Sequence, residues 1–490
     1  MGSLYGSLSI VTGALGAEQG ALEATTNNVA NVNTPGYSRL RAVLVENAPV
    51  VLGSVAYGSG VSLQKLESLR DPILQLRIQE ETQQQGQLNA SLNALQQAQV
   101  QFTTSSGDIG TEIANFFSSL SELSSDPTNL SLRQGVLTAA ANLSGAFNNT
   151  ANNLSQQRTN LDLSVGQDVQ QVNVLTQQIA TLNTQVSQLQ GVNLDASSLV
   201  DQRDVLIGRL SGLIDVNSIQ SDNGLTITTS NGTALVVGGQ SFALSTQVDA
   251  SGVQHVFAQG ADITSTLTSG ELGGLLQVRD QTIPGLLSNL DTLAAGLVNG
   301  LNTANQAGFD LNGGAGGNLF VPPPAGGVGA AAAMAVAITD PALIAASSDG
   351  TPGSNGNVAV LSAVHDQPVA GGQTPTAYYS NIVFAVGNDV ANNSAELSAS
   401  QSILSQLQDQ RASISGVSLD EEASNMVQFQ RAFDAAAQVV TTVNDMPRSC
   451  AEAGVLQRVV TLTQIPGEIL QATQYHERAH KALACPPHVK

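Results

Sequence analysis

Charge, cysteine and long apolar runs are all scarce in this sequence. Charged residues make up only 11% of the chain, against roughly 25% in an average soluble protein. No cysteine precedes Cys450, so disulfides are excluded as the element that holds the main body together. No run of about 18 apolar residues occurs, which predicts that nothing spans a membrane.

Basic residues are missing from the N-terminal region, where the first one is Arg39. A cleaved secretory signal needs a positively charged segment ahead of an apolar one. We therefore expect that, if the protein leaves the cell, its export route does not read a cleaved signal. The net charge of −21 disfavours nucleic-acid binding, because an acidic surface repels phosphate, and it gives no support for contact with an anionic membrane.

The chain is long and is rich in apolar residues and uncharged polar side chains. At 490 residues it is too long for one ordinary core, and we expect about two to four domains. Hydrophobic residues make up 42%, which is enough for globular packing. A polar but weakly charged surface hydrates well and still allows close contact between identical copies. This composition favours a polymer subunit, although a secreted low-complexity surface protein has it too.

Both ends of the body carry a narrow apolar stripe with heptad spacing, which predicts helices over about residues 1–30 and 419–446. Pro35 and Gly36 end the first helix. We predict that the two stripes pair, because isolated helices are marginal in water; ordinary surface helices of one globular domain are the alternative. The predicted interface residues are Leu4, Leu8, Val11, Leu15, Leu22 and Val29 in the first helix, and Met426, Phe429, Phe433, Ala436, Val440 and Val443 in the last.

Between the ends, the pattern predicts a mainly α fold with a small β insert. Val-rich residues 40–66 are expected to be extended. Helices are expected at about 71–101, 108–124, 130–189, 197–214, 272–306 and 377–413, and the long one keeps a seam from Leu161 to Leu189 with steps of three or four. Residues 216–268 change to short β-type runs separated by hairpin signals such as Asn223-Gly224. The Gly/Pro-rich stretch around Pro322 is expected to be irregular.

Two short segments resemble the signatures of flagellar rod, hook and hook-associated proteins. The first lies after the N-terminal helix and contains Asn28, Asn31, Asn33, Thr34, Pro35, Gly36 and Tyr37; the following Ser38-Arg39 is most similar to the hook-associated branch. The second comprises Gly416-Val417-Ser418-Leu419-Asp420-Glu421-Glu422 and the segment from Val427 to Phe433. We interpret the acidic residues 420–422 as the first turn of a helix, favoured by the helix dipole. Asn side chains near Pro35 are expected to bond local backbone at the turn.

The resemblance implies a structural subunit and not an enzyme, with no catalytic, cofactor-binding or metal-binding residue. It implies an inner coiled-coil domain from residues 1–39 with 415–446, a helical middle domain from 40–215 with 269–414, and a β-rich outer domain from 216–268. Copies would form a ring-like homo-oligomeric layer between hook and filament, one per protofilament. The implied partners are the hook protein, a second junction protein on the flagellin side and an export chaperone at the C-terminal helix. Export by the flagellar type III apparatus would place the protein outside the cell.

Residues 447–490 do not fit this pattern, because the next seam position after Val443 is Pro447, and proline inside a helix costs about 3 kcal/mol. A frameshift after about Met446 is our hypothesis; a short apolar helix end in another reading frame would support it. The tail contains His476, Glu477 and His480, which match the zinc-protease pattern H-E-x-x-H. No surrounding domain supplies a cleft, so we interpret the match as chance.

Three alternatives stay open at this point. A hook or distal-rod protein shares the wider family signature, but Tyr37-Ser38-Arg39 and the long helical middle argue against it. A secreted zinc protease would use His476, Glu477 and His480. An adhesin would bind through the β insert, residues 216–268.

Overall fold

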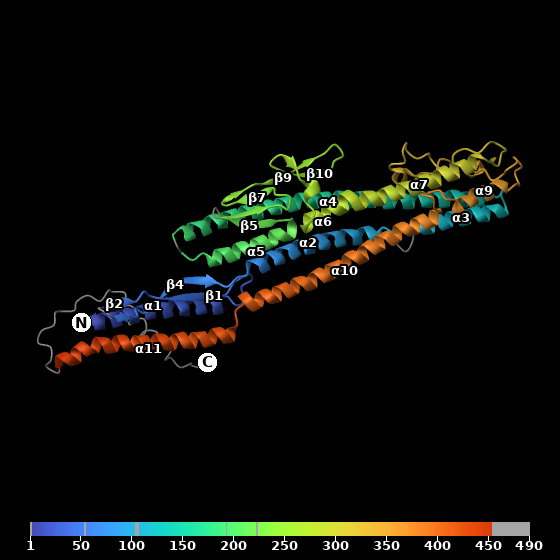
Figure 1. The fold of residues 1–490 in the computed structure, drawn as a ribbon. Coiled ribbons are helices and arrows are strands. Elements are labelled where there is room, and N and C mark those ends of the chain that lie inside the picture. Colours follow the sequence, from blue (N-terminus) through green and yellow to red (C-terminus); the bar gives the residue numbers. More distant parts are fainter. Residues whose placement is uncertain (1, 53–54, 103–106, 193, 222–223, 453–490) are drawn as a thin grey trace, which may run out of the picture. The chain divides into compact units, whose positions relative to one another are not determined.

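A computed structural model describes the chain except residues 1, 53–54, 103–106, 193, 222–223 and 453–490 (Figure 1). It confirms the expected fold class, mainly α with small sheets. The helices near the chain ends are α1 (Gly2–Ala30), α10 (Pro375–Ser415) and α11 (Leu419–Glu452). Those of the middle are α2 (Pro72–Val100), α3 (Ile109–Ser125), α4 (Leu130–Gly191), α5 (Ser197–Leu213), α6 (Gly270–Gln277), α7 (Ile283–Gln306), α8 (Ala330–Ala333) and α9 (Gly356–Ala363).

The strands form small, separate sheets. β1 (Leu40–Glu46) pairs with β4 (Val61–Ser68), and the antiparallel hairpin of β2 (Val50–Leu52) and β3 (Val55–Tyr57) lies between them in sequence. In the region expected to be a β insert, β5 (Asn217–Ser221), β6 (Gly224–Thr228), β7 (Ala234–Val237) and β8 (Gln240–Ser241) form one antiparallel sheet. β9 (Leu244–Val248), β10 (Gln254–Ala258) and β11 (Ala261–Asp262) form another.

The chain divides into two compact units. The terminal unit contains the described residues up to Thr26, those from Ala42 to Leu66 and those from Ala423 onward. The body unit contains residues from Asn27 to Arg41 and from Glu67 to Glu422. Both chain ends therefore contribute to one compact unit, although most of the sequence separates them.

Within the terminal unit, α1 buries small residues. Ala17, Ala21 and Ala24 are each 1% exposed. A Cβ atom on Gly13 would lie 2.7 Å from the Val61 carbonyl oxygen, and one on Gly20 would overlap Leu63. Because no side chain intervenes at these glycines, strand β4 packs directly on the backbone of α1.

The body unit is a helical bundle around α4, whose seam residues Val165, Val172 and Ile179 are fully buried. α10 packs along α2, α2 packs against α5 and α6, and α3 and α5 pack against α4 (Figure 1). Strands β7 to β10 lie on α4. The long apolar period predicted for α4 is thus the central core of this unit.

Three local features differ from the sequence prediction. The helix expected at 272–306 is interrupted by the π-helix η2 (Val278–Thr282) between α6 and α7. The short helices α8 and α9 lie between residues 307 and 376, where the sequence predicted no helix, and α8 closely follows the stretch around Pro322. α11 runs to Glu452, past the expected end near residue 446 and through Pro447.

Candidate functional site

Asn28, the first buried residue of the signature, joins three segments with its side-chain amide. Its Nδ2 donates to the Leu40 carbonyl oxygen at 2.9 Å and to Glu422 Oε2 at 3.1 Å. Its Oδ1 accepts from the Leu40 backbone N–H at 2.8 Å and from the Tyr37 hydroxyl at 2.9 Å. Asn28 is only 1% exposed, and its two N–H groups and two lone pairs are all used. The end of α1 is thereby tied to the first turn of α11.

Arg39 holds the same first turn through charge. Its guanidinium lies 2.7 Å from Glu421 Oε2 and 2.7 Å from Glu422 Oε1. The Arg39 backbone N–H donates to the carbonyl oxygen of Ser415, the last residue of α10, at 2.9 Å. Glu422 is buried, so this pair is stronger than an exposed one. The acidic turn therefore has a specific partner besides the helix dipole, which sequence reasoning missed.

Ser38 attaches the turn to α5. Asp201 accepts from the Ser38 hydroxyl at 2.8 Å and from the Ser38 backbone N–H at 3.1 Å. Arg70 donates to Asp201 Oδ1 at 2.8 Å and to the Ser197 carbonyl oxygen at 2.8 Å. Burial raises the pKa of Asp201, while Arg70 and the bonds from Ser38 act in the opposite direction. The pKa of Tyr37 is raised to about 12, mainly by burial and then by nearby carboxylates.

We call this set of residues the linker clasp: Asn28, Gly36, Tyr37, Ser38, Arg39, Arg70, Asp201, Arg411, Glu421 and Glu422. All of them belong to the body unit. The other signature residues lie at its edge: Asn31 donates to the Asn27 carbonyl oxygen at 3.0 Å and accepts from Thr34, while Asn33, Thr34 and Pro35 are exposed. Only Asn31 bonds local backbone as the sequence predicted; Asn28 reaches across the fold.

Gly36 allows the turn to fit against α5. Its φ is +82°, a region that residues with a Cβ rarely adopt, and a Cβ there would overlap Val205 Cγ2. The Gly36 carbonyl oxygen accepts from Arg411 Nη2 at 2.9 Å. The signature glycine is therefore required by both backbone conformation and close packing.

Gly36→Ala is expected to lower the free energy of unfolding by about 1–2 kcal/mol from backbone strain alone, with a further loss from the contact with Val205. Adding Val205→Ala should recover the second part only. Gly208→Ala, on α5 with no atom near its added methyl, should stabilise the protein by about 1 kcal/mol or less. Urea denaturation measures the free energy of unfolding of the parent chain, the Gly36→Ala variant, the Gly36→Ala and Val205→Ala double variant, and the Gly208→Ala variant. Equal effects of Gly36→Ala and Gly208→Ala would contradict this account of the turn.

The predicted interface residues are half-buried. In α1 this holds for Leu8, Val11, Leu15, Leu22 and Val29, and the side chain of Leu4 lies outside the described ones. In α11 it holds for Met426, Phe429, Phe433, Ala436, Val440 and Val443. The stripe of each helix thus keeps part of its apolar surface accessible.

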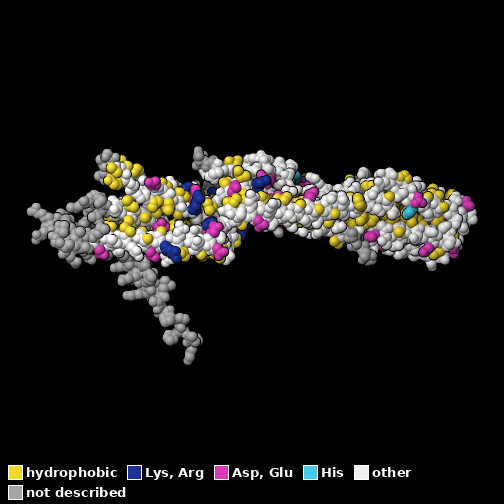
Figure 2. Space-filling model, turned by 60° about the horizontal axis from the view of Figure 1, so that its bottom comes forward, with side chains coloured by type: hydrophobic (Ala, Val, Ile, Leu, Met, Phe, Trp, Pro, Cys, Tyr) yellow, Lys and Arg dark blue, Asp and Glu magenta, His cyan; other side chains and the backbone are white. Residues whose placement is uncertain are grey.

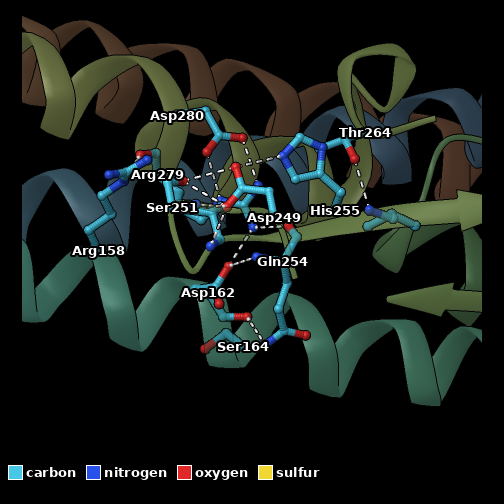
Figure 3. Close-up of polar contacts among 12 residues, drawn as sticks. Arg158, Asp162, Ser164, Asp249, Ser251, Gln254, His255, Thr264, Arg279 and Asp280 are labelled. Carbon is cyan, nitrogen blue, oxygen red and sulfur yellow. Dashed lines mark hydrogen bonds and ion pairs between the residues drawn. The ribbon is translucent and has the colours of Figure 1, made fainter. Parts of the chain in front are cut away.

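A second polar cluster, which we call the insert anchor, fixes the β strands to the bundle (Figure 3). Arg279 is completely buried and donates to Asp162 Oδ1 at 2.8 Å and to the Gln254 carbonyl oxygen at 2.7 Å. Its remaining N–H groups reach Asp280 at 2.8 Å. Asp162 Oδ1 also accepts from the Gln254 backbone N–H at 2.9 Å. One arginine from the π-helix thus joins α4 and β10.

Two asparagines extend this attachment along α4. Asn173 brackets Leu244 of β9, donating to its carbonyl oxygen at 2.8 Å and accepting from its N–H at 2.7 Å. Asn183 donates to the Leu225 and Gly238 carbonyl oxygens at 3.2 and 2.8 Å. Positions 162, 173 and 183 are spaced by about three helical turns, so they share one face of α4. The apolar periodicity of the sequence gave no signal for these three polar positions.

These clusters bind and position chain segments; no catalytic set is recognisable in them. His255 lies 2.7 Å from Asp262 and 3.5 Å from Asp249, beside a cavity of about 640 Å³ that Arg158 and Asp280 also line. Among the described residues, no group of three or more His, Cys, Asp or Glu is placed to hold a metal ion. None of the described helices is both long and apolar enough to cross a bilayer. His476, Glu477 and His480 lie outside the described residues.

Comparison with known families gives three matches along the chain. The flagellar hook-associated protein FlgK helical domain matches residues 95–320. The flagella basal body rod protein family matches residues 8–37, and the flagellar basal body rod FlgEFG protein C-terminal family matches residues 408–451. The two terminal matches include both signatures and most of the linker clasp.

Individual relatives cover almost the whole chain. Flagellar hook-associated protein 1 of Escherichia coli (strain K12) is 27% identical over 88% of this chain and 96% of its own length. The protein of the same name from Bacillus subtilis (strain 168) is 28% identical over 91% and 97%. The solved structure of the flagellar hook junction protein FlgK from Burkholderia pseudomallei shares the fold, with a TM-score of 0.63 and 18% identity over 69% of this chain and all of that one. Over 88–91% of its length this chain is thus similar to flagellar hook-associated protein 1, and its matches indicate a structural component of the bacterial flagellum.

Proposed function

We propose that this chain forms the layer that joins the hook of the flagellum to its filament. The observation that carries the proposal is the bond from Asn28 to Glu422, two buried residues 394 positions apart. It ties the end of the first helix to the beginning of the last one. A subunit whose two ends leave its body together can present both terminal helices to the same neighbours.

The proposed partners are those that the resemblance to flagellar hook-associated proteins implies. Identical copies meet through apolar surfaces of the terminal unit, among them the half-buried stripes of α1 and α11. The hook protein lies on one side of the layer, and a second junction protein leads to flagellin on the other. A contact between different surfaces of identical copies builds rings or helices. Before assembly, a chaperone covers α11, and the flagellar type III apparatus exports the chain to the cell exterior.

A gene deletion tests the proposal. Cells without the chain should build hooks, form no filaments and release flagellin monomers into the medium. The full chain supplied from a plasmid should restore filaments, and Gly208→Ala should restore them equally well. Filaments of normal length in the deletion strain would contradict the junction role. A chain ending at residue 446 shows in the same assay whether the tail permits assembly.

A further inference from the structure

The hairpin of β2 and β3 in the terminal unit exposes apolar side chains on both of its faces. Val50 is 52% exposed, Val51 67%, Val55 49% and Tyr57 55%. Neighbouring residues of a strand point to opposite faces, so Val50 and Val51 leave neither face covered. The adjoining strand β1 adds Leu44 and Val45, at 39% and 41%.

Such a hairpin is unstable by itself. Two-stranded hairpins in water are marginal without a hydrophobic partner surface, and in the described part of the chain β2 and β3 form a sheet of two strands only. Contiguous exposed apolar side chains mark a site of contact with another molecule. The hairpin and β1 therefore present an apolar surface that the described part of the chain leaves uncovered.

The absence of charge indicates the kind of cover. Residues 47–64 contain no Asp, Glu, Lys or Arg. Nucleic acid and anionic membranes are bound through basic side chains, and the hairpin offers none. Figure 2 shows the same character more widely: hydrophobic side chains reach the surface among few charged ones.

The chain itself carries a matching surface on α1. No side chain of residues 1–17 is charged, and Leu8, Val11 and Leu15 are half-buried there. The exposed face of α11 is less suitable, since it carries Arg431 and has Asp434 beside it. An uncharged apolar hairpin and an uncharged apolar helix face complement each other.

We propose that the β2–β3 hairpin of one copy docks on the first half of α1 of a second copy. The inference rests on the proposed function, because it assigns the surfaces through which copies in the junction layer meet. The two surfaces differ, so the contact is heterologous: each copy uses its hairpin toward one neighbour and its α1 toward the other. Such contacts propagate into a ring or helix and do not close into a two-fold dimer.

Directed cross-linking tests this pairing in full-length chains with Cys450→Ser and Cys485→Ser. One chain carries Val51→Cys and another Val11→Cys, and a short bismaleimide is added while the protein concentration is raised in steps. Each chain alone should stay monomeric, and a mixture of the two should give a cross-linked dimer that does not grow further. A chain with both cysteines should give a ladder of higher species.

A control chain with Val427→Cys, on the exposed part of α11 at 49%, should give no dimer with the Val51→Cys chain. Cross-linking of Val51→Cys to itself would mean a two-fold hairpin contact and would overturn the proposal. Monomers in every mixture, at the highest concentration reached, would also overturn it. Restoration of filaments by the cysteine-free chain in the deletion strain is measured separately. Restored filaments without the expected cross-links would overturn the docking proposal alone, whereas normal filaments in the deletion strain would overturn the junction role.

Discussion

Replacing Arg279 by methionine is expected to lower the free energy of unfolding by about 3–5 kcal/mol, because removal of one partner leaves a buried charge uncompensated. Asp162, which is 9% exposed, would lose the cation that lies 2.8 Å from its Oδ1. The Gln254 carbonyl oxygen would lose a donor at the same time. Because Gln254 belongs to β10, the damage should also loosen the attachment of that strand to α4.

Urea denaturation measures the loss, and amide hydrogen exchange locates it. Exchange should accelerate in β9 and β10 more than in α2 and α10. The double variant Asp162→Asn with Arg279→Met should recover part of the stability, since no buried charge then stands alone. The matched control is Arg41→Ala, whose partner Glu67 lies 2.9 Å away at the surface; its effect should be about 0.5 kcal/mol or less. A similar small effect of Arg279→Met would contradict the role of the insert anchor.

Asp168→Asn is expected to stabilise the protein by an amount that grows as the pH rises from about 4 to 7 and is then constant. Asp168 is 6% exposed on α4, and its Oδ2 has no hydrogen-bond partner in the described structure. Burial, with a smaller contribution from Glu271, raises its pKa from 3.8 to about 7. In the unfolded chain the carboxyl loses its proton near pH 4, whereas the folded chain keeps it. Stability therefore falls as the pH rises from about 4 to 7 and is constant above.

One pKa unit corresponds to about 1.4 kcal/mol. A shift of this size sets an upper limit of about 4 kcal/mol, and solvent screening reduces the expected gain at pH 8 to about 2 kcal/mol. At pH 4 the variant and the parent chain should be equally stable. Thermal denaturation at pH 4, 6 and 8 measures the difference, with the exposed Asp389→Asn as the control. An equal gain at all three pH values would show that charge is not the cause.

Apolar periodicity predicted the main helices well, because their burial repeats along the sequence. The seam of α4 is an example: Leu161, Val165, Val169 and Val172 were expected on one face and are buried. The hairpin signals between residues 216 and 268 likewise indicated strands. Such features depend on residues close together in the sequence, so a single sequence is enough to predict them.

Single polar residues with distant partners could not be predicted in this way. Arg279 has no periodic neighbour that marks it, and its partner Asp162 is 117 positions away. The π-helix that turns Arg279 inward follows from tertiary packing and leaves no local signal. The sequence predicted the linker clasp only in part. The signature indicated Asn28 and Gly36, but nothing in the sequence paired Asn28 with Glu422 or Ser38 with Asp201.

The junction role is tested most directly by the position of the chain in isolated flagella. Gold-labelled antibodies against residues 216–268 should mark one narrow band where the hook meets the filament, in electron micrographs of flagella with hooks attached. Gold-labelled pre-immune antibodies should leave the same flagella unmarked. Label along the hook, at the rod or along the filament would contradict the account.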